Sequence, residues 1–149
     1  MNIFYEGELM MRKTILGILL CGIILLEITG CGNKKNFKLN LPKEDKLKNI
    51  TLEKNSNKLD ILDEEEIKNI IYVLNGFGED RTTKEESIQD YPVNANEIIK
   101  IEFNFKGEEK GKSILFIYKK GNKSFIEVPY NGIYKINEDE YNSIEKYIR

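Results

Sequence analysis

A short polar stretch is the best candidate for hydroxyl chemistry in this sequence. Thr82, Thr83, Ser87 and Asp90 fall within nine consecutive positions. A hydroxyl acts as a nucleophile when a neighbouring base takes its proton. Because the chain contains no histidine, that base would have to be a lysine or a carboxylate. We treat the four residues as a possible loop site, against the alternative that they only bond backbone groups of an irregular loop.

Carboxylate pairs are the other candidates for chemistry, and local structure accounts for them. Glu64 with Glu66, and Glu138 with Glu140, lie where two helices are expected to begin, and acidic side chains stabilise the first turn of a helix. No calcium-binding loop pattern is present. The missing histidine removes the commonest ligand of transition metals. We therefore expect no metal site, no cofactor and no enzymatic activity.

A second candidate site is a recognition surface on the predicted sheet. Tyrosine offers contact area at a low entropic cost, which suits such a surface. The five residues are Tyr118, Phe125, Glu127, Tyr130 and Tyr134. The alternative is that the aromatic residues only pack at the rim and core of a small sheet. Glu127 then either points to solvent at a strand edge or pairs with a lysine such as Lys100 or Lys119.

Near the N-terminus, one cysteine lies in a pattern that predicts covalent modification. A basic start at Met11 precedes the apolar run Ile15–Leu26 and the sequence Ile-Thr-Gly-Cys that ends at Cys31. This pattern resembles the lipobox of bacterial lipoproteins, which implies cleavage between Gly30 and Cys31 and attachment of palmitate-bearing lipid to Cys31. A membrane-spanning helix is the alternative, but it needs about 20 apolar residues, and this run is shorter and is followed by Glu27.

The predicted signal peptide and cleavage site imply that the chain has four parts. Residues 1–10 fit no part of a signal peptide, so translation is expected to start at Met10 or Met11. Residues 11–30 form the signal peptide, and residues 31–36 a polar, lipidated tether of at most about 20 Å. Residues 37–149 form a single extracytoplasmic domain on the outer face of the cytoplasmic membrane. Lipid on Cys31 makes the membrane its first partner.

Two predicted helices and several strands must position the candidate residues. Asp63 begins a helix at about Glu64–Asn75, and Asn137 begins a second one with apolar residues on one face. Alternating side chains predict a strand at residues 99–105, and a turn at residues 55–57 predicts a hairpin. The long polar segment from Gly76 to Asn96 is expected to be a loop with one short strand. Residues 37–41 form an edge strand or an extended lead-in.

The strongest hairpin signal surrounds Gly121-Asn122, a pair suited to a type II′ turn. Counting outward places Tyr118 opposite Phe125 and Phe116 opposite Glu127. One face of this hairpin is aliphatic, and the face that carries Phe116 and Glu127 is expected to be partly exposed. With a short strand near residues 133–135, the sum is an α+β domain: an antiparallel sheet of four or five strands with two helices packed on it.

Composition and a family resemblance bound the function. The formal charge of -2 arises from 23 basic and 25 acidic residues, so no strong field exists to attract nucleic acid. The stretches at residues 81–90, 98–103 and 126–134 resemble a family of small uncharacterised Gram-positive lipoproteins, grouped as a domain of unknown function. The resemblance implies a surface lipoprotein domain and carries no catalytic role onto any residue here.

Two classes of function remain from the sequence. The first is a non-catalytic binding module for an unknown envelope or membrane protein, or for the cell-wall polymer. The second is a small envelope hydrolase that uses carboxylate or hydroxyl chemistry. A deep pocket around Thr83, Ser87 and Asp90 would favour the hydrolase.

Overall fold

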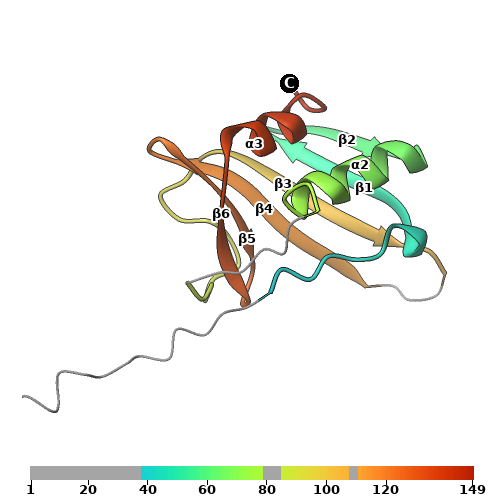
Figure 1. Cartoon of the computed structure of the whole chain (residues 1–149), viewed down its shortest axis with the longest axis horizontal. Helices are drawn as coiled ribbons and strands as arrows, with labels where there is room; N and C mark the ends of the chain where they lie inside the picture. The colour runs from blue at the N-terminus through green and yellow to red at the C-terminus, as the bar shows by residue number, and fades with distance from the viewer. Residues whose placement is uncertain (1–37, 79–84, 108–110) are drawn as a thin grey trace, which may run out of the picture. The chain divides into compact units, whose positions relative to one another are not determined.

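Six antiparallel strands form one sheet in the computed structural model, which describes residues 38–78, 85–107 and 111–149 (Figure 1). The strand order across the sheet is β2-β1-β3-β4-β5-β6. The strands are β1 (Leu47–Lys54), β2 (Asn57–Ile61), β3 (Asn96–Phe105), β4 (Lys112–Lys120), β5 (Lys123–Val128) and β6 (Gly132–Ile136). The expectation of four or five strands is therefore wrong, because the short strands β2 and β6 both pair fully and form the two edges.

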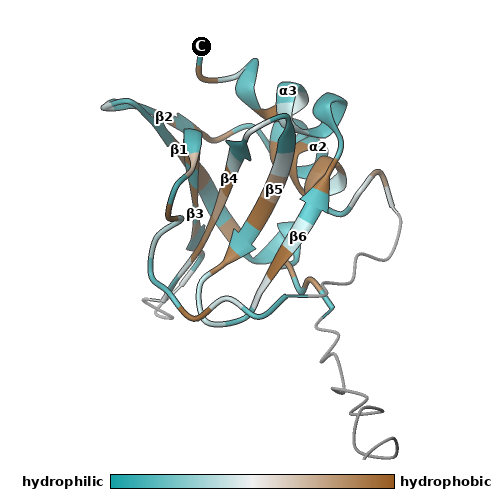
Figure 2. Cartoon of the chain, turned by 90° about the vertical axis from the view of Figure 1, so that its left-hand side faces the viewer, coloured by the Kyte–Doolittle hydropathy of each residue, from teal (hydrophilic) through white to brown (hydrophobic). Residues whose placement is uncertain are grey.

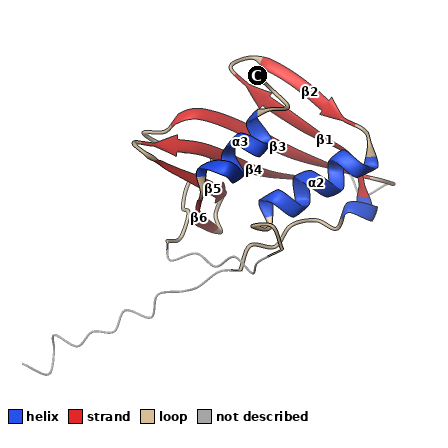
Figure 3. Ribbon diagram, turned by 45° about the horizontal axis from the view of Figure 1, so that its top comes forward, coloured by secondary structure: helices blue, strands red, loops and turns tan. Residues whose placement is uncertain are grey.

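Both α-helices pack on one face of this sheet, as the sequence predicts (Figure 3). They are α2 (Glu64–Leu74) and α3 (Glu138–Glu145), and a 3-10 turn, η1 (Glu44–Lys46), precedes β1. The Asp63 side chain accepts hydrogen bonds from the first turn of α2. Asn137 and Glu140 form a reciprocal capping box at the start of α3. Local capping chemistry thus starts both helices where it was expected to.

The core lies between the helices and every second residue of the strands. Figure 2 shows apolar and hydrophilic residues following one another along the strands. Ile50, Ile101 and Ile117 point from the sheet to the helices and are fully buried. Leu39 is also buried in this core, so the described part of the expected segment at residues 37–41 packs as a lead-in; Phe37 lies outside the described residues.

Turn chemistry sets the register of the two tight hairpins. Asn55 and Ser56 both have positive φ, 48° and 72°, as a type I′ turn requires. Gly121 has a φ of 58°, and the β4–β5 register pairs Tyr118 with Phe125 and Phe116 with Glu127. The predicted register of this hairpin is confirmed.

A segment without regular structure crosses the face of the sheet that the helices leave open. We call residues 85–95 the strap. The backbone of Glu85 pairs with Ile133 on β6, Ser87 bonds to Glu127 on β5, and the ring of Tyr91 packs edge-on against Phe116 on β4 at 5.1 Å. The strap therefore begins at the edge strand β6 and runs across β5 to β4. Within the strap, this bridge to β6 takes the place of the short strand expected between Gly76 and Asn96; residues 79–84 of that range lie outside the described residues.

The strap buries a face of the β4–β5 hairpin that was expected to be partly exposed. Phe116, Tyr118 and Glu127 are all buried, and Glu127 has no exposed surface at all. The expectation is wrong for these three residues, whereas Ile114 and Phe125 on the same face are half-buried. The covering segment is held by side chains distant in sequence, which the periodicity of the two strands cannot reveal.

Candidate functional site

The predicted loop site is split by the structure. Thr82 and Thr83 lie outside the described residues, Ser87 is buried and Asp90 is exposed. The Ser87 hydroxyl donates a hydrogen bond of 2.6 Å to Glu127 Oε1, and the Gln89 side chain donates a longer one of 3.3 Å to the same oxygen. This contact fastens the strap to the sheet.

The structure divides the predicted recognition surface between the two faces of the sheet. The strap covers Tyr118 and Glu127, whereas Tyr134 pairs with Ile126 and lies in the core on the helix side. Tyr118 and Tyr134 are buried, Phe125 is half-buried and stacks on Tyr118 with ring centroids 5.7 Å apart, and Tyr130 is exposed. Burial, followed by the neighbouring Glu127 carboxylate, raises the pKa of Tyr118 above its ordinary value. Glu127 neither faces solvent nor pairs with any lysine that the structure describes, Lys100 and Lys119 included, so both interpretations of it are wrong.

The two predicted sets nevertheless meet, because the strap lies directly on the hairpin. Ser87 contacts Glu127, and a hydrogen bond to Asp90 raises the pKa of Tyr130. Side chains that are buried in this way have no access to a ligand. Among these residues, Tyr130, Asp90 and part of Phe125 remain at the surface.

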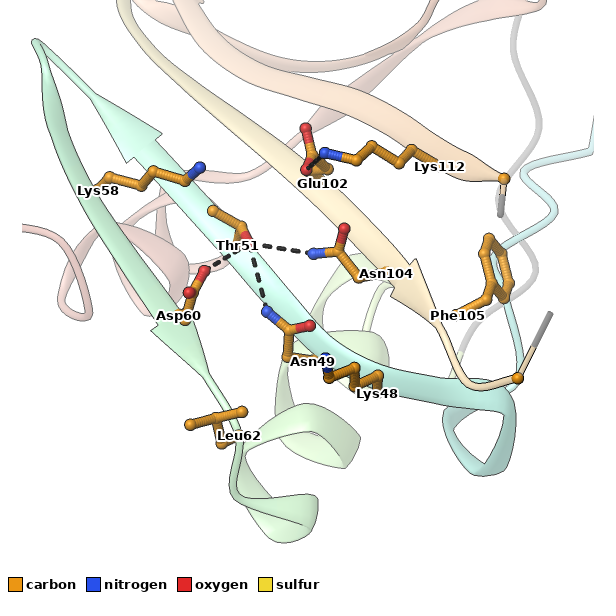
Figure 4. Close-up of a pocket in the computed structure, with 12 residues that line it drawn as sticks. Lys48, Asn49, Thr51, Lys58, Asp60, Leu62, Glu102, Asn104, Phe105 and Lys112 are labelled. Carbon is orange, nitrogen blue, oxygen red and sulfur yellow. Dashed lines mark hydrogen bonds and ion pairs between the residues drawn. The ribbon is translucent and has the colours of Figure 1, made fainter. Parts of the chain in front are cut away.

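A polar cleft occupies the part of the open sheet face that the strap does not cover (Figure 4). It has a volume of about 510 Å³. The floor is formed by β1, β2 and β3, and its central residues are Asn49, Thr51, Asp60, Glu102 and Asn104. Thr51 lies opposite Asp60 on one side and opposite Glu102 on the other, so strand register alone brings these side chains into one row.

The Thr51 hydroxyl is the hub of a hydrogen-bond network on this floor. It donates to Asp60 Oδ1 at 2.6 Å and accepts from Asn104 Nδ2 at 3.1 Å and Asn49 Nδ2 at 3.4 Å. Because its one proton goes to Asp60, both asparagines must turn their NH₂ groups towards Thr51. Each amide is thereby held with its carbonyl oxygen available to a ligand.

Charges at the rim of the cleft are balanced. Glu102 accepts a hydrogen bond of 2.6 Å from Lys112 Nζ, and Lys100 Nζ lies 3.6 Å from its other oxygen. The hydrogen bond from Lys112 holds the pKa of Glu102 below its ordinary value, and Lys100 adds to this effect. Glu102 is therefore an ionised acceptor at neutral pH, unlike a general acid, whose pKa must be raised.

Neither a metal centre nor a membrane span is found in the part of the chain that the structure describes. No three histidine, cysteine or acidic side chains within it are grouped to hold a metal ion. None of its helices has the length and apolar character needed to cross a bilayer. The lipidation residues Gly30 and Cys31 lie outside the described residues.

Sequence reasoning missed the cleft entirely. Asn49 and Thr51 alternate along β1, as Glu102 and Asn104 do along β3, and such alternation is also typical of a plain solvent-facing strand. The distinguishing signal is chemical. Short amide and hydroxyl side chains at outward positions of neighbouring central strands, where long charged ones are more usual, indicate a polar network.

Comparisons with known proteins assign a family and a related fold. The model of the DUF5301 family, whose description reads "Domain of unknown function (DUF5300)", matches residues 35–135. An NMR structure of a protein from Ruminococcus gnavus is 34% identical and matches with a TM-score of 0.54, over 69% of this chain and 98% of that one. A search of curated proteins finds no match.

Proposed function

Given that the chain belongs to the DUF5301 family, a domain of unknown function, we propose that it is a non-catalytic binding module. In this proposal, lipid on Cys31 holds the domain at the outer face of the cytoplasmic membrane, and the polar cleft takes the ligand.

One observation carries the binding proposal: the Thr51 hub holds two amide groups in fixed orientations on the cleft floor. Asn49 and Thr51 are buried, at 9% and 5% exposure, so their geometry is set by the fold before any ligand arrives. Groups that are ordered in advance lose little entropy on binding. Such an arrangement favours recognition of a polar ligand by hydrogen bonds.

The electrostatics of the cleft favour binding over catalysis. The Thr51 hydroxyl is fully engaged by three partners, and the paired Glu102 is held ionised by Lys112. A nucleophile needs a free attack path, and a general acid needs a raised pKa. The Thr51 hydroxyl has no free attack path, and the pKa of Glu102 is lowered, so neither residue is suited to catalysis.

A small envelope hydrolase is the second candidate, and one contact favours it. The 2.6 Å hydrogen bond between Ser87 and Glu127 joins a hydroxyl to a carboxylate without histidine. However, Ser87 is 2% exposed and Glu127 is 0% exposed, so a substrate would reach them only if the strap moved away. The contact therefore supports a structural role more strongly than a catalytic one.

The anchor is tested by metabolic labelling with an alkyne analogue of palmitate. We expect the wild-type chain to take up the label and to partition with membranes, and the Cys31→Ala variant to do neither. Label on the Cys31→Ala variant, or unlabelled wild type, would contradict the lipoprotein assignment.

The binding cleft is tested by site-specific photocrosslinking in intact cells. The photoreactive residue replaces Lys58, which is exposed and lines the cleft. The control carries it at Tyr72, which is exposed on α2 and so lies on the helix-covered side of the sheet. We expect an adduct at position 58 that is lost when Asn104→Leu is added. Equal adducts at both positions, or none at position 58, would overturn the proposal.

A further inference from the structure

A second cavity lies at the other end of the same open sheet face. Its volume is about 460 Å³, and it is lined by Glu53 on β1, Lys100 on β3 and Tyr91 of the strap, among others. Glu53 and Lys100 are paired across the strands two positions along from Thr51 and Glu102. Because side chains alternate between faces, the two pairs share one face.

Lys100 lies between the floors of the two cavities. Its Nζ lies 3.6 Å from Glu102 in the first cavity and 3.7 Å from Glu53 in the second. We call the two cavities together the sheet groove. Along β3 the residues that line the two cavities run from Phe105 to Asn96, which is about 30 Å at roughly 3.3 Å per residue. This length suits an elongated ligand rather than a single small molecule.

The sheet groove has no net charge of its own. Four lysines and four carboxylates line it: Lys48, Lys58, Lys100, Lys112, Glu53, Asp60, Glu97 and Glu102. A polyanion would meet as much repulsion as attraction there. The balance favours an uncharged ligand that both donates and accepts hydrogen bonds.

An aromatic ring stands at each end of the groove. Phe105 lines the first cavity with a half-buried ring that also packs against the core, and Figure 4 shows this ring at the edge of the cleft. Tyr91 lines the second cavity; it is 56% exposed, and its contact with Phe116 fixes its ring. Sugar rings present C–H faces that pack on aromatic rings, while their hydroxyl and acetamido groups pair with amides such as Asn49 and Asn104.

We propose that the sheet groove binds a linear, uncharged glycan that bears hydroxyl and acetamido groups. The sugar faces pack on Phe105 and Tyr91, and the polar edges bond to the amides of Asn49 and Asn104. This inference rests on the proposed binding function and names its ligand class.

Calorimetric titration of the full chain, held in a detergent without sugar groups, tests the ligand class. The probes are N-acetylglucosamine and its linear tetramer. We expect the tetramer to bind at least about tenfold more tightly, because the monomer engages only one end of the groove. Asn104→Leu should weaken tetramer binding roughly tenfold through the loss of paired amide hydrogen bonds, while Tyr72→Ala has no effect. Equal affinities for the two probes, or an unaffected Asn104→Leu variant, would overturn the inference.

Tryptophan fluorescence provides a second test, with a substitution that retains an aromatic ring in the groove. The chain contains no tryptophan, so Phe105→Trp introduces a single tryptophan, which can be excited selectively, at one end of the groove, and Tyr72→Trp introduces one on α2 as a control. We expect the tetramer to shift the emission of Phe105→Trp alone. An unchanged emission overturns the glycan assignment. A protein adduct at position 58 in the photocrosslinking experiment, with neither probe binding, would retain the binding module and reject the glycan.

Discussion

The hydroxyl of Tyr141 on α3 donates a 2.7 Å hydrogen bond to the backbone carbonyl of Glu97 on β3. Glu97 lies where the register of β3 shifts and has a φ of 50°, a conformation that needs support from its surroundings. Burial, followed by the nearby Glu145 carboxylate, raises the pKa of Tyr141, so its hydroxyl stays protonated as a donor. The bond ties α3 to the irregular end of β3 that borders the second cavity.

Tyr141→Phe should therefore destabilise the domain. The substitution keeps the buried ring and leaves the Glu97 carbonyl without this donor, which lowers the free energy of unfolding by about 1–2 kcal/mol. Urea denaturation measures the change. Tyr72→Phe, at an exposed position on α2, is the matched control. Equal stability of the two variants would show that the bond contributes nothing.

Ser87→Ala should loosen the strap. The buried Glu127 carboxylate already has one oxygen, Oε2, without a hydrogen-bond partner among the described residues, and the variant removes the shorter bond to the other oxygen. We expect a loss of roughly 1–3 kcal/mol in unfolding free energy, and faster amide hydrogen exchange across residues 85–95. Ser143→Ala on α3 serves as the control. Unchanged exchange in the strap would contradict the role given to this contact.

Glu102 should make the stability of the domain depend on pH. Its folded pKa lies below the ordinary value of 4.5, so its ionisation stabilises the fold above that pH, and this contribution is lost as the pH falls through the lowered pKa. Because Lys112 is 59% exposed, the contribution is about 1 kcal/mol or less. Unfolding free energies measured from pH 7 to pH 3 should fall less steeply for Glu102→Gln than for wild type. An equally steep fall for the two proteins would contradict this role of Glu102.

Thr51→Val should disorder the cleft floor while keeping the shape of the side chain. The variant lacks the hydroxyl that three neighbours share, so we expect a loss of roughly 1–3 kcal/mol in unfolding free energy and a weaker adduct at position 58. Thr51→Ser keeps the hydroxyl and should retain the adduct. If Thr51→Val crosslinks as efficiently as wild type, the hub does not orient the ligand-binding amides.

Local chemistry explains which parts of the fold the sequence predicts well. Asp63 and Asn137 each start a helix through contacts within four residues, and Gly121 sets the register of the β4–β5 hairpin. The strap could not be predicted in this way. Ser87 and Glu127 are 40 residues apart, and the segment that contains Ser87 has no periodicity that indicates a partner.

The candidate site was predicted less well than the fold. The face that carries Tyr118 and Glu127 is amphipathic in the sequence and was expected to be partly exposed. Strand alternation distinguishes the two faces of a sheet but does not say what covers each one. Asn49 and Thr51 were missed for a different reason. They belong to a polar face that looks merely solvated until β1 is placed beside β3, and that pairing joins strands separated by β2, α2 and the strap.

The ladder between β1 and β3 is the one place in the sheet where neighbouring strands are not consecutive in the chain. Every other ladder closes a short loop, whereas this one must bring together distant parts of the chain, and non-local pairing of this kind slows folding. The floor of the sheet groove draws Thr51 from one side of this ladder and Glu102 from the other. The groove therefore does not exist in the separate hairpins, and competence to bind arises only when this non-local ladder has formed.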